Sequence, residues 1–391
     1  MDFMKLTEYI DSLNETYKIP AADIKITRKH EVVYRHSTGY SDYQKTKPVS
    51  DQDLYRLYSA TKVITMTAVM QLVERGELGL YDELNDYFPE FSKLRVADNF
   101  AIDKYPIKWP DSKTPCHLAH NTIRIIDLMS MTAGLSYDME SEPLLAIKNN
   151  NNQATTSEVI AEIAKMPLVY EPRTRWGYSI AHDVLAGVIE KVAGLTFGEY
   201  LQQNIFQPLE ISDFHFKIDD IVKSRMSALY QGEFGKDTFI PDQGGFSNSF
   251  NVTANYESGG AGLISTIDAY SKFVDALSCG GVGVSGNRIL SEESIKLFST
   301  NYLVGQQLDD FRITGKTGYG YGLGVRVLVD KTKSNTPLGE FGWDGAAGAY
   351  AVIDPVNNVS ITYFQHIFGF PKVYSEIHPK LRDLAYEAMK L

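Results

Sequence analysis

The chain has 391 residues, of which 43% are hydrophobic and 22% are charged, a composition typical of a folded protein with one two-lobed unit or two domains. Its formal net charge of −11 argues against nucleic acid and anionic membrane surfaces as partners, because both bind basic faces. With two cysteines and no apolar run near the roughly 20 residues of a membrane span, the chain predicts neither a disulfide framework nor a transmembrane helix.

Predicted strands gather at the two ends of the chain, and predicted helices lie between them. Residues 5–17 predict an amphipathic helix, and β-rich segments at 23–27 and 31–36 then predict a hairpin. Seven helices are expected in the middle, at 63–75, 123–130, 157–164, 182–192, 197–204, 267–277 and 292–299. The C-terminal part predicts strands and a last helix, at 321–329, 339–343, 349–353, 359–364 and about 373–389.

This order of elements predicts an α+β fold. One antiparallel sheet, flanked by helices, would combine the N- and C-terminal segments. We expect a sheet lobe made of residues 1–80 and 305–391, and an inserted, mainly helical lobe made of residues 81–304. The active site is expected between the two lobes.

One S-x-x-K sequence occurs in the chain, formed by Ser59 and Lys62. Residues three apart on a helix share a face, with about 5–6 Å between their Cβ atoms, so Lys62 could take the proton of the Ser59 hydroxyl. Ser59 at a helix start would also place its own backbone N–H where an oxyanion forms. The alternative is that Ser59 caps a helix and Lys62 is an exposed residue of the first turn.

The helix that follows favours the catalytic interpretation. From Val63 to Val73 it is apolar on nearly every side, which is typical of a central, buried helix. A lysine at its start would be desolvated, and desolvation lowers a lysine pKa toward that of a usable base. The sequence therefore predicts Ser59 as a nucleophile and Lys62 as its base.

Three segments resemble, in matching order, motifs of the class C β-lactamase-like serine hydrolases: LYSATK at 57–62, TIRIIDLMSMTAGL at 122–135 and ESGGAGLIST at 257–266. They are similar to the nucleophile helix, the T-I-R-x-L-L-x-H-T-S-G-L signature and the S-x-G-G-L-x-S-T turn of that group. The group recognises penicillins and includes D-alanyl-D-alanine peptidases and family VIII carboxylesterases. The resemblance implies a β-lactamase/transpeptidase-like fold from about residue 20 onward.

The resemblance also implies a catalytic tyrosine. The segment WGYS at 176–179 falls where the family carries its Tyr-x-Asn motif, which makes Tyr178 the expected partner of Lys62. An ammonium beside a phenol favours the phenolate, so the two groups would titrate as a coupled pair. Ile180 stands where the family has the asparagine that contacts a β-lactam side chain, and this stretch is more similar to the esterase branch.

Two segments compete for the family's third motif. KTG at 316–318 matches the family's K-T-G literally. In the family, however, that motif lies on the strand that opens the last hairpin before the terminal helix, and FGWDGAAG at 341–348 occupies this place. We therefore expect Lys316 to point elsewhere.

The resemblance then implies a set of substrate contacts. Trp343, Asp344 and Gly345 are expected to bind substrate. The backbone N–H groups of Ser59 and Ala346 are expected to form the oxyanion hole.

The expected function is hydrolysis of small acyl esters through an acyl-enzyme on Ser59, with a small-molecule substrate and neither a metal nor an organic cofactor. Trp343 in place of the K-T-G lysine removes a cation that would hold a substrate carboxylate. The same residues would also serve β-lactam hydrolysis, D-amino-acid peptide cleavage or acyl transfer to an alcohol. A non-catalytic sensor with this fold is the remaining alternative. The first residues lack the basic patch and apolar stretch of a secretory signal, so we expect a cytoplasmic location.

His117 and His120 have the i, i+3 spacing of two metal ligands on a helix. A third ligand is not apparent near them, and Pro115 interrupts the segment. We therefore expect a polar loop at this place, and no metal site.

Overall fold

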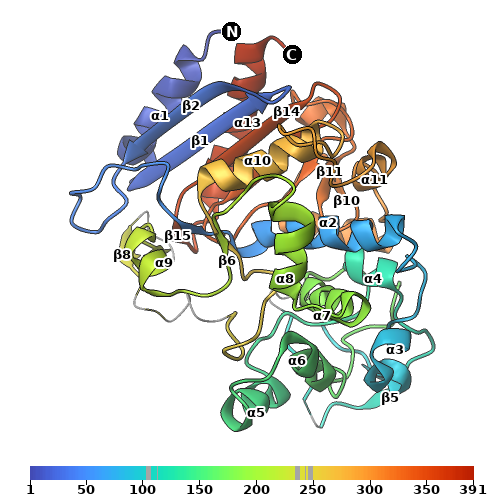
Figure 1. Ribbon diagram of the computed structural model, residues 1–391. Coiled ribbons are helices and arrows are strands. Elements are labelled where there is room, and N and C mark those ends of the chain that lie inside the picture. The colour runs from blue at the N-terminus through green and yellow to red at the C-terminus, as the bar shows by residue number, and fades with distance from the viewer. Residues whose placement is uncertain (103–106, 112, 234–237, 243, 245–249) are drawn as a thin grey trace.

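A computed structural model describes residues 1–102, 107–111, 113–233, 238–242, 244 and 250–391 (Figure 1). Its largest sheet has seven strands in the order β10-β11-β12-β13-β14-β1-β2, and neighbouring strands run antiparallel. The seven strands are β1 (Ala21–Arg28), β2 (Glu31–Gly39), β10 (Tyr319–Tyr321), β11 (Arg326–Leu328), β12 (Phe341–Gly342), β13 (Tyr350–Asp354) and β14 (Val359–Phe364).

The two ends of the chain meet inside this sheet. β1 lies between its hairpin partner β2 and the C-terminal strand β14, with Ile24 opposite Tyr363. Ile24 and Ile26 are completely buried, as the β-rich pattern of this segment requires. The predicted antiparallel sheet from N- and C-terminal segments is therefore confirmed.

Helices cover both faces of the sheet (Figure 1). On one face lie α1 (Met4–Tyr17) and α13 (His378–Met389), whose apolar residues form one buried cluster with β1, β13 and β14. Side chains alternate along a strand, so Lys25 and Thr27 of β1 point to the opposite face. There they bond to Asp268 and Asp275 of α10 (Ile267–Ser278), each at 2.7 Å.

The expected division into residues 1–80 with 305–391 and residues 81–304 stays a prediction. It places α10 in the helical lobe, yet these contacts bind α10 to the sheet. A helix packed on a sheet shares the hydrophobic core of that sheet, so α10 is part of the sheet layer whatever its position in the sequence.

One helix runs through the middle of the molecule. α2 (Thr61–Glu74) is buried along residues 61–72, as its apolar sequence predicts. Below it in Figure 1 lies the mainly helical region. The remaining α-helices are α3 (Leu84–Tyr87), α4 (Ile125–Met129), α5 (Glu142–Asn150), α6 (Thr156–Ile163), α7 (Ala181–Ala193), α8 (Phe197–Leu201), α9 (Asp220–Arg225), α11 (Glu292–Phe298) and α12 (Gln306–Phe311).

Short elements connect these parts. The small sheets are β3 (Tyr55–Arg56) with β9 (Ile264–Ser265) and β6 (Phe214–His215), β15 (Ile367–Phe368) with β7 (Tyr230–Gly232) and β8 (Phe239–Pro241), and β4 (Arg95–Ala97) with β5 (Cys116–Leu118). The short helical turns are η1 (Tyr58–Ala60), η2 (Pro89–Lys93), η3 (Gln202–Phe206), η4 (Arg312–Thr314), η5 (Lys331–Lys333) and η6 (Val373–Ile377).

The segment predicted as one strand at 321–329 is instead a tight hairpin of β10 and β11, so this prediction is wrong. Gly324 in the turn has a φ of +78°, a backbone conformation that favours glycine. A Cβ atom on Gly324 would lie 2.2 Å from Cγ of Met66, so this hairpin also packs directly against α2. The two glycines of the turn let the chain reverse within a segment whose apolar content resembles a strand.

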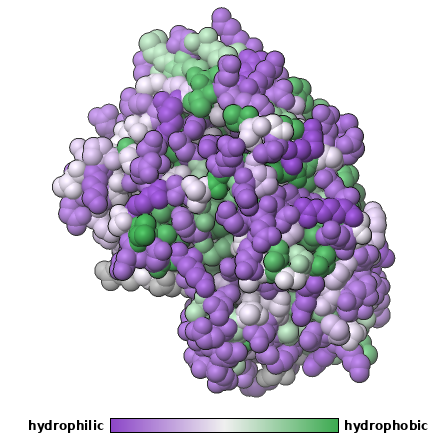
Figure 2. Space-filling model, viewed as in Figure 1, coloured by the Kyte–Doolittle hydropathy of each residue, from purple (hydrophilic) through white to green (hydrophobic). Residues whose placement is uncertain are grey.

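The surface seen in Figure 2 is mostly hydrophilic, with hydrophobic residues scattered among hydrophilic ones. In the part of the chain that the structure describes, we find no helix whose length and apolar character would allow it to cross a membrane.

Candidate active site

Ser59 lies in the sharp turn between strand β3 and helix α2. The preceding residue, Tyr58, has a φ of +45°, which is strained for a residue with a bulky side chain. Its buried ring packs with Phe250, Leu229 and Ala347, and this packing holds the turn in place. The backbone strain therefore lies at Tyr58, the residue directly before Ser59.

Lys62 lies next to Ser59, as the S-x-x-K spacing predicts. Its Nζ donates hydrogen bonds to Ser59 Oγ at 3.2 Å, to the Gly260 carbonyl at 2.8 Å and to the Tyr137 hydroxyl at 3.3 Å. Burial lowers the pKa of Lys62 to about 7, although the nearby Asp183 carboxylate opposes this shift. Near neutral pH this amine can therefore hold or release a proton beside the Ser59 hydroxyl.

Tyr178 and Trp343 complete one wall of this cluster. The Lys62 Nζ lies 4.6 Å from the centre of the Tyr178 ring, and the Trp343 ring stacks on Tyr178 with 5.6 Å between centroids. The Trp343 Nε1–H donates a hydrogen bond to the Tyr178 hydroxyl at 3.0 Å. The structure thus brings together four of the predicted residues, Ser59, Lys62, Tyr178 and Trp343.

Tyr137 is a site residue that the sequence reasoning missed. Besides accepting the hydrogen bond from Lys62, its ring lies 5.1 Å from Nζ and 5.4 Å from the Tyr178 ring. It follows the Gly134-Leu135 end of the TIRIIDLMSMTAGL segment by two residues. Its place just after this motif is the only sequence signal that could have singled it out among 24 tyrosines.

The segment ESGGAGLIST at 257–266 contacts Lys62 through the Gly260 carbonyl. The buried carboxylate of Asp183 accepts hydrogen bonds from the hydroxyls of Ser258 at 2.6 Å and Tyr256 at 2.7 Å. These bonds hold the turn whose Gly260 carbonyl faces Lys62. A Cβ on Gly260 would lie 2.4 Å from Asp183 Oδ2, so this position requires glycine. Burial raises the pKa of Asp183, and its hydrogen bonds oppose that shift.

The WDG segment, which follows strand β12, approaches the residues next to Ser59. A Cβ on Gly345 would lie 2.1 Å from the Leu57 carbonyl oxygen, so the two backbones touch at this glycine. Ala346 packs against Tyr58, directly before Ser59. Among the described residues, neither Ser59 nor Ala346 uses its backbone N–H in a backbone hydrogen bond. Both N–H groups therefore remain available for a substrate oxygen.

Asp344 does not join the Ser59 cluster. Its carboxylate forms ion pairs with Lys316 and, at 3.4 Å, with Arg326. Trp343, the preceding residue, instead contacts Tyr178. Because the Asp344 carboxylate is already paired with Lys316 and Arg326, the geometry does not support the predicted contact of Asp344 with substrate.

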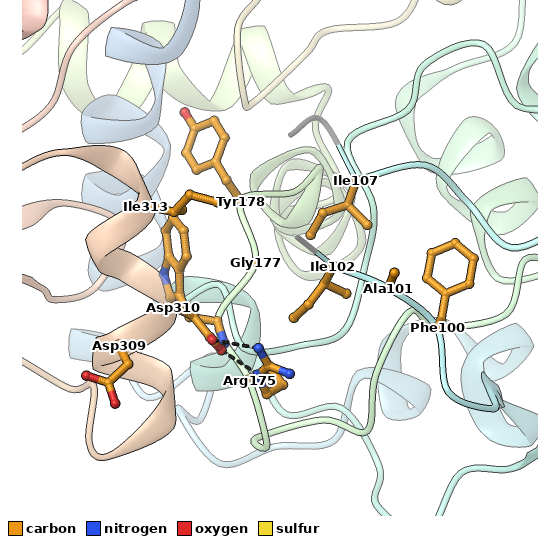
Figure 3. A pocket seen from close by; sticks show the side chains of 11 residues that line it. Phe100, Ala101, Ile102, Ile107, Arg175, Gly177, Tyr178, Asp309, Asp310 and Ile313 are labelled. Carbon is orange, nitrogen blue, oxygen red and sulfur yellow. Dashed lines mark hydrogen bonds and ion pairs between the residues drawn. The ribbon is translucent and has the colours of Figure 1, made fainter. Parts of the chain in front are cut away.

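A pocket of about 430 Å³ opens beside Tyr178 (Figure 3). Its walls are largely apolar and include Phe100, Ile102 and Ile107. A bidentate ion pair lies at one side, where Arg175 contacts Asp310 with two distances of 2.7 Å. Of the predicted site residues, Tyr178 lines this pocket, and the charges of Arg175 and Asp310 at its side are paired with each other.

No cluster of potential metal ligands coincides with Ser59 among the residues that the structure describes. Two such clusters lie elsewhere: His30 with Asp275 and Cys279, and His117 with His120 and Glu171. The cluster of Ser59, Lys62, Tyr137, Tyr178 and Trp343 offers hydroxyl, amine and backbone N–H groups, which nucleophilic acyl chemistry uses.

Comparisons with known proteins agree with this architecture. A family model described as Beta-lactamase matches residues 6–385. Protein Rv1367c of Mycobacterium tuberculosis (strain ATCC 25618 / H37Rv) is 29% identical over 87% of this chain and 84% of its own length. Esterase EstB of Burkholderia gladioli is 25% identical over 98% of this chain and 94% of its own length. The solved structure titled "EstCE1, a hydrolase with promiscuous acyltransferase activity" has a TM-score of 0.78, with 24% identity and 98% coverage of both chains.

The buried pair of Lys316 and Asp344 generates a test of stability. Lys316→Ala should lower the free energy of unfolding by about 3 kcal/mol, the low end of the cost of breaking a buried pair, because Arg326 still faces Asp344. Lys333→Ala, at an exposed lysine that lines a pocket together with Lys316 and Asp344, should change this free energy by less than about 0.5 kcal/mol. Urea unfolding measures both variants, and equal small changes would show that the pair does not stabilise the fold.

Proposed function

Because this chain belongs to the β-lactamase family, whose members are generally serine hydrolases, we propose that it hydrolyses small acyl esters through an acyl-enzyme on Ser59. The observation that carries the proposal is the contact of 3.2 Å between Lys62 Nζ and Ser59 Oγ. The pKa of about 7 allows Lys62 to be neutral, and only a neutral amine can accept the serine proton.

The first half of the reaction acylates Ser59. Neutral Lys62 takes the hydroxyl proton while Oγ forms a bond to the ester carbonyl carbon. The carbonyl electron pair moves onto oxygen, and the N–H groups of Ser59 and Ala346 stabilise this oxyanion. When the intermediate collapses, the bond to the alcohol oxygen breaks and the alcohol leaves with the proton that Lys62 took.

The second half releases the acid. Water attacks the acyl carbon and gives its proton to the pair of Lys62 and Tyr178. Collapse then breaks the bond to Oγ, which recovers a proton as the carboxylic acid departs. Tyr178 is assigned to this proton transfer because its ring covers Lys62 at 4.6 Å and Trp343 orients its hydroxyl. Tyr137 is assigned to holding the Lys62 amine.

The surroundings favour neutral substrates with an apolar group. Trp343 stands where a lysine would bind a carboxylate, and Lys316 is held by Asp344. Ile180 has a hydrocarbon side chain and is completely buried, so this position has no side-chain amide for a β-lactam. The apolar pocket beside Tyr178 would accept a hydrocarbon part of the substrate. These features speak against β-lactams and D-amino-acid peptides as preferred substrates.

Acyl transfer to an alcohol is the second candidate, since an apolar pocket beside Tyr178 could also hold an acceptor alcohol. It uses the same acyl-enzyme, with the alcohol oxygen in place of water. A non-catalytic sensor is the weakest alternative, because a binding protein does not need an activated serine.

A labelling experiment tests the nucleophile. A fluorophosphonate probe should modify Ser59 and no other serine, because among the described serines only Ser59 has a buried amine of lowered pKa beside it. Peptide mass spectrometry identifies the site, and Ser59→Ala is the control. A panel of p-nitrophenyl esters, nitrocefin and D-Ala-D-Ala peptides should then show ester hydrolysis at the highest rate. Labelling of another serine in an active protein would reject the proposal.

The pKa of Lys62 predicts the pH dependence of ester hydrolysis. The amine must be neutral, so kcat/KM should rise through an apparent pKa of about 7 and be lost at lower pH. The Asp183 carboxylate raises the pKa of Lys62, so Asp183→Asn should move this limb to lower pH while keeping an acceptor for Tyr256 and Ser258. Asp268→Asn, a carboxylate on α10 bonded to Lys25, should leave the limb in place. An unmoved limb in Asp183→Asn would exclude this coupling.

The two tyrosines can be separated by their different roles. Tyr178→Phe should lower kcat by at least about 100-fold, the range of a general acid–base group. Tyr137→Phe removes one hydrogen bond to Lys62 and should cost no more than about tenfold, the equivalent of about 1.4 kcal/mol. The double variant Lys62→Ala/Tyr178→Phe should be little slower than either single variant. Steady-state kinetics measure all of these, and the reverse order of the two losses would exchange the assigned roles.

A further inference from the structure

His117, His120 and Glu171 form a tight cluster apart from the serine. The His117 Nε2 and the His120 Nδ1 each lie 3.0 Å from the same oxygen, Oε1 of Glu171. His117 belongs to strand β5, His120 to the turn after it, and Glu171 to the segment that leads to Tyr178. The third ligand that is not apparent in the sequence is thus supplied by a residue about 50 positions away.

The cluster has the second layer of contacts that metal-binding histidines carry. The Nδ1 of His117 lies 2.6 Å from Asp98 Oδ1, so a carboxylate fixes the ring with Nε2 directed at Glu171. Metal-ligating histidines usually have such an acceptor on their other nitrogen. The Glu171 carboxylate is itself held by the backbone N–H of His120, at 3.1 and 3.2 Å from its two oxygens.

We propose that His117, His120 and Glu171 bind one divalent transition-metal ion of the zinc type, with Asp98 orienting His117. Two imidazoles and one carboxylate are a common donor set for Zn²⁺, with distances of about 2.0–2.2 Å. Tetrahedral bonds of this length separate two ligand atoms by about 3.3 Å, so the present 3.0 Å contacts need to widen by a few tenths of an ångström. A ring nitrogen binds a metal ion only without its proton, so binding is coupled to proton release. A fourth position stays open to water, because the His120 side chain is 78% exposed.

The site would join two parts of the chain. β5 and its turn would be linked through the ion to the segment that begins at Glu171.

The second cluster, of His30, Asp275 and Cys279, is less well arranged for a metal ion. The Cys279 Sγ is 4.0 Å from Asp275, and that carboxylate already binds Thr27 at 2.7 Å. Replacing Cys279 by serine removes the thiol of this second cluster, so that the cluster does not compete for metal in the experiment below.

Calorimetric titration of the untagged Cys279→Ser protein with Zn²⁺ tests the proposal without reference to ester hydrolysis. One ion should bind per chain, and the heat should depend on the ionisation enthalpy of the buffer because a proton is released. His120→Gln and Glu171→Gln should abolish this binding. Asp98→Asn should weaken it by about 10- to 100-fold, as expected for an orienting partner.

His36→Gln is the matched control. His36 also pairs with a carboxylate, Asp11, at 2.7 Å, yet no second histidine joins that pair in the described part of the chain. Its loss should leave the titration unchanged. The proposal is overturned if the Cys279→Ser protein binds no stoichiometric Zn²⁺, or if binding is undiminished in His120→Gln, a variant whose exposed side chain is not needed for folding.

Discussion

The ammonium group of Lys62 is completely buried, and the groups packed around it are arranged to tolerate that charge. A buried cation without partners costs several kcal/mol. The three N–H donors of Lys62 meet three acceptors, on Ser59, Tyr137 and Gly260, and the carboxylate of Asp183 lies nearby. Desolvation lowers the pKa of Lys62 and the Asp183 carboxylate raises it, and the balance is a pKa of about 7. The same amine is therefore stable as a cation and usable as a base.

Two glycines allow this arrangement, because in each case a backbone group approaches another group more closely than a side chain would permit. At Gly260 the approach is to Asp183, and it brings a carbonyl to Lys62. At Gly345 the approach is to the Leu57 carbonyl, and it brings the next N–H group toward Ser59. The glycines in the ESGGAGLIST and WDG segments thus have a steric cause. A methyl group at either position would separate the elements on which the proposed chemistry depends.

Local patterns in the sequence could predict much of this. The apolar run after Lys62 predicts the buried helix, and the strand patterns at the two ends predict the sheet. The prediction of Tyr178 as a site residue depended on the resemblance to a family. The sequence could not predict the third ligand Glu171 or the pairing of Lys316 with Asp344, because each contact joins segments that only the tertiary fold brings together. For Tyr137, its place just after the TIRIIDLMSMTAGL segment was the one available signal. The turn at Gly324 was missed for the opposite reason, since its local apolar content outweighed the glycines.

The contacts of Trp343 and Asp344 explain how a literal K-T-G segment coexists with the site for neutral substrates that we propose. Trp343 faces Tyr178, while the next side chain, Asp344, faces Lys316. The Lys316 Nζ also lies 5.2 Å from the Trp343 ring centre, so this lysine contacts both residues. Its charge is balanced by Asp344 and is not available to attract a substrate carboxylate. Lys316, a cation that could select carboxylate-bearing substrates, instead binds Asp344 and packs against Trp343. Under the proposed function, the Trp343 ring favours uncharged esters.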